Sequence, residues 1–224
     1  IASCLVGSEM CIRDRGSSLS LAYSQEHPNN ILSIVLRGVF LCRKKEVEWF
    51  LHGIKNIFPE YWNRFNSFLP KDERKNLLLS YYERLINIDP IINGEAAVSW
   101  ARYEANCSTL LPNASISEEF VDVQMALNLA RIEAHYFLNH LFLEEGQLLK
   151  NINNIKNIHG DIIQGRYDSI CPPESAYELA SIWPNANLQI IEKAGHSSLE
   201  APIQKALLET CLLYTSDAAD EEDS

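Results

Sequence analysis

The alternation of hydrophobic and polar positions divides the chain into two kinds of sequence. Residues 17–27 have the composition of a helix, Pro28 ends it, and the apolar run "ILSIVLRG" follows at 31–38. A short apolar run bounded by turn residues is typical of a buried parallel strand. From about 44 to 150 the apolar residues recur instead at helical spacing, interrupted by prolines. The pattern therefore predicts a helix and a strand followed by a long helical block.

Strand-like runs return after the helical block, at 161–168 and 187–196, with helix candidates at 174–182 and 199–213. Strands that alternate with helices indicate a parallel sheet covered on both faces. The predicted fold class is therefore α/β, with a sheet interrupted by a helical insertion. Only three strands are visible in the sequence, which is few for a sheet buried on both faces, so we expect the N-terminal strands of the fold to be missing.

The composition narrows the range of partners. The 224-residue chain has a formal net charge of −11 and no basic stripe, which argues against nucleic acid as a partner. No run approaches the roughly 18 uninterrupted apolar residues of a membrane helix, so we expect no membrane association. The six cysteines include no C-x-x-C pair, which favours a reducing compartment and hence the cytoplasm.

Two titratable residues stand at the carboxyl ends of predicted strands, Asp168 and then His196. Reactive groups of open α/β sheets lie on loops at these ends, and an imidazole that acts as a base needs a carboxylate to orient it. The pair in this order favours a serine hydrolase, although no G-x-S-x-G pentapeptide is present. The alternative is that Asp168 caps a turn and His196 is an ordinary loop residue.

Two glutamates fall on apolar stripes of predicted helices, Glu104 and Glu133. A carboxylate that faces a core or a cleft needs a cation or several donors. One interpretation is a structural ion pair with Arg131, Arg102 or Arg37. The other is that both carboxylates recognise a cationic group of a substrate.

The sequence predicts no metal site. His135, His140 and Glu144 share the helix expected over 124–145, but His135 and His140 are five positions apart and point in different directions. Since the sequence also lacks G-x-G-x-x-G and a phosphate-binding loop, we expect no cofactor.

Residues 16–210 resemble the prolyl aminopeptidases (proline iminopeptidases), serine peptidases of the α/β-hydrolase fold. The resemblance lies in "SLAYSQEHP", "LRGVFLCRKKEVEWF", "STLLP", "ARIEAHYF", "GRYDSICP" and "WPNANLQIIEKAGHSSLE". It implies a hydrolase core with a helical cap. It also implies that small peptides lose their N-terminal proline through a Ser-His-Asp acyl-enzyme mechanism.

The resemblance also implies roles for individual residues. Asp168 and His196 would be the two downstream members of the triad. Glu104 and Glu133 would be the cap carboxylates that hold the free amino terminus of the substrate, with Arg37 near them. The pocket for the proline ring would be lined by Phe40, Phe50 and Cys171, although the family more often has tyrosine where this chain has Phe50.

The resemblance stops at both ends of the chain. The nucleophile would stand two places before Gly16, where this sequence has Asp14. Residues 4–15 and 211–224 resemble translated sequencing-adaptor reads. We therefore predict artefactual flanks at 1–15 and 211–224, an α/β-hydrolase core at 16–43 and 151–210, and a helical cap at 44–150.

Two further hypotheses remain open at this point. The same fold could act on an ester, lactone or epoxide instead of a peptide. The chain as written could also be a catalytically dead fragment or a hydrolase-like binding protein, because it lacks the serine and the oxyanion loop. On either the peptidase or the fragment hypothesis, we expect this chain itself to be inactive.

Overall fold

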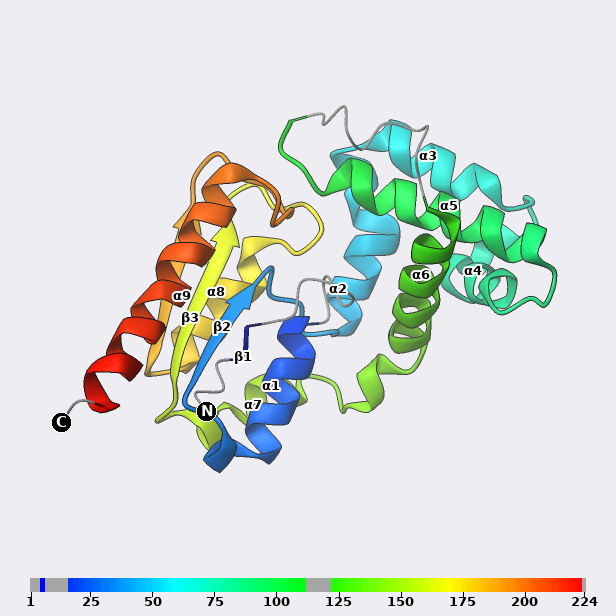
Figure 1. Ribbon diagram of the computed structural model, residues 1–224. Helices are drawn as coiled ribbons and strands as arrows, with labels where there is room; N and C mark the ends of the chain where they lie inside the picture. Colours follow the sequence, from blue (N-terminus) through cyan, green and yellow to red (C-terminus); the bar gives the residue numbers. More distant parts are fainter. Residues whose placement is uncertain (1–4, 7–15, 112–121, 223–224) are drawn as a thin grey trace. The chain divides into compact units, whose positions relative to one another are not determined.

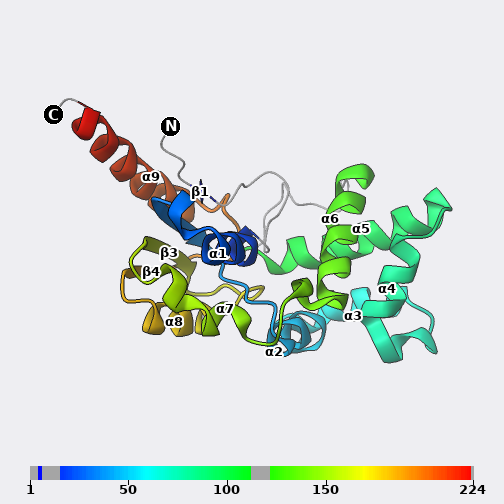
Figure 2. The same ribbon diagram turned by 90° about the horizontal axis from the view of Figure 1, so that it is seen from below.

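The computed structural model describes residues 5–6, 16–111 and 122–222, and Figures 1 and 2 show the ribbon from two directions. The chain forms two compact units. One, the sheet unit, combines Ile1–Leu41 with Gly146–Ser224. The other, the helical unit, is Cys42–Glu145. The helical unit is thus inserted into the sheet unit along the sequence.

The sheet unit contains a parallel sheet with the strand order β1-β2-β3-β4. Its strands are β1 (Leu5–Val6), β2 (Ser33–Arg37), β3 (His159–Gly165) and β4 (Ala186–Ile191). The register pairs Leu36 with Ile162, and Ile162 with Leu188. The three strands expected from the sequence and their parallel pairing are confirmed, and the fold class is α/β.

Strand β1 was not predicted from the sequence. Its two residues pair with Ile34 and Val35 of β2, although residues 1–15 were expected to lie outside the fold. The pairing uses backbone groups, which an edge strand such as β2 offers to any extended segment. Two residues are too few to show an apolar period, so the sequence pattern did not reveal β1.

Helices cover both faces of the sheet. Figure 2 shows α9 on one face and α8 on the other. On the α9 side, Val35 and Ile163 pack with Ile203 and Ala206 of α9 in one buried cluster. On the other face, Trp183 at the end of α8 lies over Gly160, where an added Cβ would meet its ring at 2.4 Å. The helices of this unit are α1 (Gly16–Glu26), α7 (Gln147–Lys150), α8 (Pro173–Ile182) and α9 (Ala201–Glu222), with the 3₁₀ turns η1 (Pro28–Asn30) and η7 (Ile152–Ile155).

The helical unit has its own aromatic core. Phe65 stacks on Tyr81 with ring centroids 4.3 Å apart and on Tyr103 at 4.4 Å, and Trp100 meets Phe65 edge-on. The longer helices are α3 (Pro59–Phe68), α4 (Leu77–Leu85), α5 (Pro90–Cys107) and α6 (Val123–Leu138). The shorter elements are α2 (Lys44–Glu48), the π-helical turn η2 (Trp49–Gly53), and the 3₁₀ turns η3 (Ile54–Asn56), η4 (Glu73–Asn76) and η6 (His140–Phe142). Helices α3 and α5 begin at prolines, which lack the N–H that a first helical turn leaves unbonded.

The helix expected over 124–145 ends earlier than predicted. Helix α6 stops at Leu138, and His140, Leu141 and Phe142 all have positive φ between 50° and 58°. Asn139 caps the helix, since its side chain donates to the carbonyl oxygen of His135 at 2.8 Å. The apolar spacing continues past this point, so the pattern alone did not reveal the left-handed turn. His140 therefore does not share a helix with His135.

None of the helices in the described residues is both long and apolar enough to cross a membrane.

Candidate active site

The structure brings Asp168 and His196 together in the sheet unit. Asp168 follows β3 and His196 follows β4, so both stand beyond the carboxyl ends of neighbouring strands. Nδ1 of His196 lies 2.8 Å from Oδ2 of Asp168, and both side chains are buried. With Nδ1 directed at a carboxylate, Nε2 is the ring nitrogen directed toward the opposite side. This is the geometry that a general base requires of an imidazole and its orienting carboxylate.

The turn after β3 fixes the position of the Asp168 carboxylate. Oδ1 accepts hydrogen bonds from the backbone N–H of Ile170 at 3.0 Å and of Cys171 at 2.7 Å. Oδ2 accepts from Gln164 Nε2 at 3.1 Å in addition to facing His196. Two bonds on each oxygen hold the carboxylate in one plane. The carboxylate of Asp168 thus both caps the turn and contacts the imidazole of His196.

Close backbone packing joins the loop of Asp168 to the loop of His196. An added Cβ at Gly165 would lie 1.9 Å from the carbonyl oxygen of Gly195, so this contact requires glycine. Tyr167 N donates to the carbonyl oxygen of Ala194 at 2.9 Å. Gly38, with φ of +56°, lies beside the imidazole. A Cβ added at this position would be 2.8 Å from Cε1 of His196.

Arg37 ends β2 and binds the histidine loop. Its Nη1 donates a hydrogen bond to the backbone carbonyl oxygen of His196. The structure therefore gives Arg37 a contact within the sheet unit. Its part in binding a substrate stays a prediction.

Phe40 and Cys171, two of the three residues expected to line the proline pocket, are buried in the sheet unit. The N–H of Phe40 donates to Ser17 Oγ at 3.0 Å, and its carbonyl oxygen accepts from Ser18 Oγ. The start of α1 thus holds the backbone of Phe40. The carbonyl oxygen of Cys171 accepts from the side chain of Gln164 at 3.0 Å.

In the helical unit, the structure places Glu133, Trp100 and Phe50 together. Glu133 is 1% exposed, and its Oε2 accepts a hydrogen bond of 2.6 Å from Trp100 Nε1. The ring of Phe50 lies 5.5 Å from that of Trp100. Glu104 is 3% exposed and stands one helical turn after Trp100 on α5. Both glutamates therefore occupy the buried stripes that the sequence predicted.

The sequence left open a structural ion pair of Glu104 and Glu133 with Arg131, Arg102 or Arg37. Arg131 directs its Nε to the carbonyl oxygen of Leu85 at 2.6 Å, and Arg37 binds the backbone of His196. The neutral indole of Trp100 is a donor to Glu133 that sequence reasoning missed. No local pattern of the sequence signals this bond, because Trp100 is on α5 and Glu133 is on α6.

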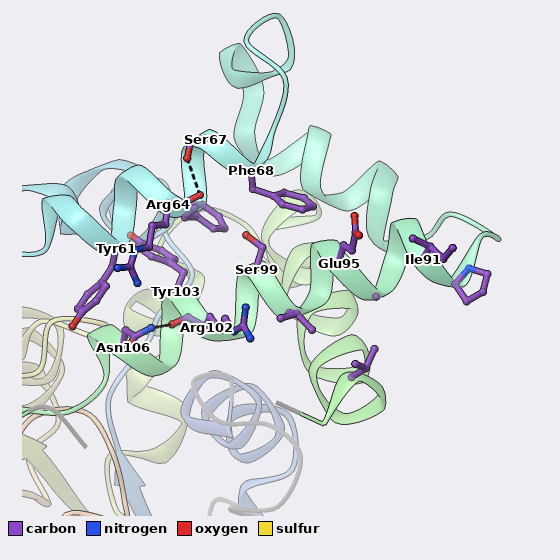
Figure 3. Close-up of a pocket in the computed structure, with 15 residues that line it drawn as sticks. Tyr61, Arg64, Ser67, Phe68, Ile91, Glu95, Ser99, Arg102, Tyr103 and Asn106 are labelled. Carbon is purple, nitrogen blue, oxygen red and sulfur yellow. Dashed lines mark hydrogen bonds between the residues drawn. The ribbon is translucent and has the colours of Figure 1, made fainter. Parts of the chain in front are cut away.

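A cavity of about 780 Å³ lies in the helical unit, outside the predicted residues (Figure 3). Tyr61 and Arg64 reach it from α3, and Glu95 and Arg102 from α5. None of the eight residues predicted for the active site lines it. No group of three or more potential metal ligands occurs among residues 5–6, 16–111 and 122–222.

Two of the solved structures that resemble this chain are esterases. An esterase from Exiguobacterium antarcticum matches with a TM-score of 0.53 and 14% identity, over 92% of this chain and 65% of that chain. A Rhodococcus esterase matches with a TM-score of 0.52 and 14% identity, over 92% and 64%. At such identity the likeness concerns the fold. Together with the parallel sheet, it defines the class of fold as α/β hydrolase.

The curated relatives point to a narrower group of proteins than the fold does. A protein of Leptolyngbya boryana named "Probable proline iminopeptidase" is 43% identical over 196 residues, which are 87% of this chain and 61% of the relative. "Proline iminopeptidase" of Arabidopsis thaliana is 41% identical over 196 residues, 86% of this chain and 52% of the relative. The chain is similar to these proline iminopeptidases over most of its own length and spans about half to three fifths of the length of these relatives. No family model matches it.

Proposed function

We propose that the protein, at the full length of its relatives, hydrolyses the peptide bond after an N-terminal proline of small peptides. The reaction proceeds through a serine acyl-enzyme. The observation that carries the proposal is the buried Asp168–His196 contact of 2.8 Å at the ends of adjacent strands. The identity of 41–43% to proline iminopeptidases supports the choice of substrate.

In this proposal His196 carries out the proton transfers and Asp168 orients it. His196 Nε2 takes the proton of the serine hydroxyl as the serine attacks the carbonyl carbon, and it returns that proton to the leaving amine. Asp168 keeps the N–H of the imidazole on Nδ1 and stabilises the charged ring. In the second half of the reaction, His196 takes a proton from water as the water attacks the acyl-enzyme, and it returns that proton to the serine as the proline is released. The position where the family has its serine is Asp14 here, outside the described residues, so we expect no turnover by the 224-residue chain itself.

The two buried glutamates fit the recognition of a cation. Burying an ionised carboxylate costs several kcal/mol unless a partner or donors offset it. Trp100 supplies one donor to Glu133, and Glu104 and Glu133 are proposed to bind the protonated amino terminus of a peptide. Phe40, Phe50 and Cys171 are proposed to contact the proline ring, and Arg37 to assist, with no cofactor required. The absence of a C-x-x-C pair supports a cytoplasmic location.

The test is turnover of a prolyl chromogenic amide by the full-length protein. The unsubstituted enzyme should release the chromophore, and Asp168→Asn should lower kcat by about 10⁴-fold, because the imidazole loses its orienting anion. Circular dichroism should show the variant folded. A folded full-length enzyme without turnover of any prolyl substrate contradicts the proposal.

An esterase with the same fold is the second candidate, because the Trp100–Glu133 hydrogen bond could be structural alone. Glu133→Gln separates the two readings. For a peptidase we expect kcat/KM on the prolyl amide to fall by about 10- to 100-fold, the value of a charged hydrogen bond, while an acetyl ester is spared. The matched control is Glu95→Gln on the exposed face of α5. No change on either substrate would assign Glu133 a structural role.

A further inference from the structure

Gln164 is a fully buried polar residue next to the Asp168–His196 pair. It is the penultimate residue of β3 and is 0% exposed. A buried amide is costly unless its donors and acceptor are satisfied. Its partners therefore show what the residue holds in place.

The amide of Gln164 joins three segments. Its Nε2 donates to Oδ2 of Asp168 at 3.1 Å and to the carbonyl oxygen of Cys171 at 3.0 Å. Its Oε1 accepts from the N–H of Val39 at 3.2 Å. A flipped amide would direct its NH₂ group at the Val39 N–H and its oxygen at two acceptors. The network thus determines the orientation of the amide.

Gln164 and His196 share one oxygen of the carboxylate. Oδ2 of Asp168 faces His196 Nδ1 at 2.8 Å and Gln164 Nε2 at 3.1 Å. A second donor on the same oxygen withdraws electron density from it, so this oxygen attracts the imidazole N–H less strongly than it would alone.

We propose that Gln164 is a positioning residue for the pair, which orients the Asp168 carboxylate and moderates how strongly Oδ2 stabilises the charged form of His196. The hydrogen bonds of the same amide to Val39 and Cys171 also hold the backbone at Cys171 and next to Phe40. The inference rests on the proposed function for the catalytic meaning of the pair, whereas its geometry stands independently.

Two other charged side chains, Arg37 and Glu200, form hydrogen bonds with the backbone of the His196 loop. The Arg37 guanidinium donates to the backbone carbonyl of His196, and Glu200, just before α9, accepts from the N–H of Gly195 at 2.7 Å. Neither contacts Gln164 through a hydrogen bond of its amide. A substitution at Gln164 therefore changes the donors to Asp168 and leaves these two contacts in place.

The experiment is an NMR titration of His196 in the ¹⁵N-labelled 224-residue chain, with the ring resonances assigned from a His196→Gln variant. Gln164→Leu should move the titration midpoint of His196 upward, because Oδ2 loses its competing donor. Gln164→Glu keeps the shape of the side chain and should also move the midpoint upward, because it adds a negative charge. An unchanged midpoint in a folded Gln164 variant overturns the proposal.

Gln25→Leu is the matched control. Gln25 is also a buried glutamine of the sheet unit, and its Nε2 donates to the carbonyl oxygen of Leu148 at 2.7 Å, away from Asp168. It should lose stability as Gln164→Leu does and leave the midpoint of His196 unchanged. A shift of equal size in the control would reduce Gln164 to a structural residue.

A measurement on the unsubstituted chain decides the matter if the Gln164 variants do not fold. The Nε2 protons of Gln164 should shift across the titration of His196, since both groups donate to one oxygen. Resonances that stay fixed overturn the proposal. This readout requires no turnover, so its failure is distinct from a failure of the proposed peptidase activity.

Discussion

At the scale of single residues, burial decides the chemistry of Cys107. The thiol lies at the end of α5 and is 1% exposed. Burial, and to a lesser extent the negative charges of Glu60 and Glu104, raise the pKa of this thiol to about 12. The cysteine therefore stays a neutral thiol at physiological pH and serves the core of the helical unit.

This raised pKa predicts a specific loss of stability in alkali. Below the ordinary thiol pKa of 9.0 both states keep the proton, and above it the unfolded chain ionises while the folded chain does not. The free energy of unfolding should thus fall as pH rises from 9 toward 12. In Cys107→Ala this fall should be smaller than in the unsubstituted chain, measured by urea unfolding at pH 8 and pH 10.5.

Cys211→Ala is the control for that measurement, because Cys211 is partly exposed. It should retain the full alkaline loss. If Cys107→Ala and Cys211→Ala show the same pH dependence, the buried thiol does not contribute to it.

At the scale of elements, local capping fixes where the helices begin. Asp122 precedes α6, and its Oδ1 accepts from the N–H of Gln124 at 2.9 Å and of Met125 at 3.1 Å. Asp89 accepts in the same way from Ile91 at the start of α5. These side chains satisfy N–H groups that the first turn of a helix leaves unbonded.

Asp122→Ala should lower the free energy of unfolding by about 1 kcal/mol, the usual value of an N-cap. Chemical denaturation measures the change. Asp72→Ala is the matched control, since Asp72 precedes η4 without a capping bond from its side chain, and it should change stability by less than about 0.5 kcal/mol. Equal effects of the two substitutions would show that the Asp122 bonds contribute nothing.

At the scale of the whole molecule, the chain divides into two compact units, and each contains buried apolar residues. The sheet unit is centred on Val35, Ile163 and the residues of α9 that cover them. The helical unit is centred on Trp100, Tyr81 and the other aromatic rings around them. Each core is contiguous within its own unit.

An excised Cys42–Glu145 segment should therefore fold without the sheet unit. Stacked and edge-to-face rings stabilise a core beyond the area they bury. We expect a helical far-ultraviolet spectrum, a near-ultraviolet signal from the buried Trp100, and cooperative thermal unfolding. A broad transition with no near-ultraviolet signal would show that this unit depends on the rest of the chain.

The sequence by itself determined the parts of this protein that follow from period and order. Apolar runs such as 31–38 gave the parallel strands, and the positions of Asp168 and His196 after two of them gave the candidate pair. The stripe positions of Glu104 and Glu133 likewise followed from helical spacing. These inferences could be drawn from the sequence because side-chain period and strand ends are local properties of the chain.

Only the tertiary structure decided which atoms meet. The amide of Gln164 joins Val39, Asp168 and Cys171, and the indole of Trp100 reaches Glu133 from another helix. The left-handed turn after Leu138 was likewise hidden by a continuing apolar pattern. Hydrogen bonds between distant segments depend on distances that folding sets, so no local pattern of the sequence carries them.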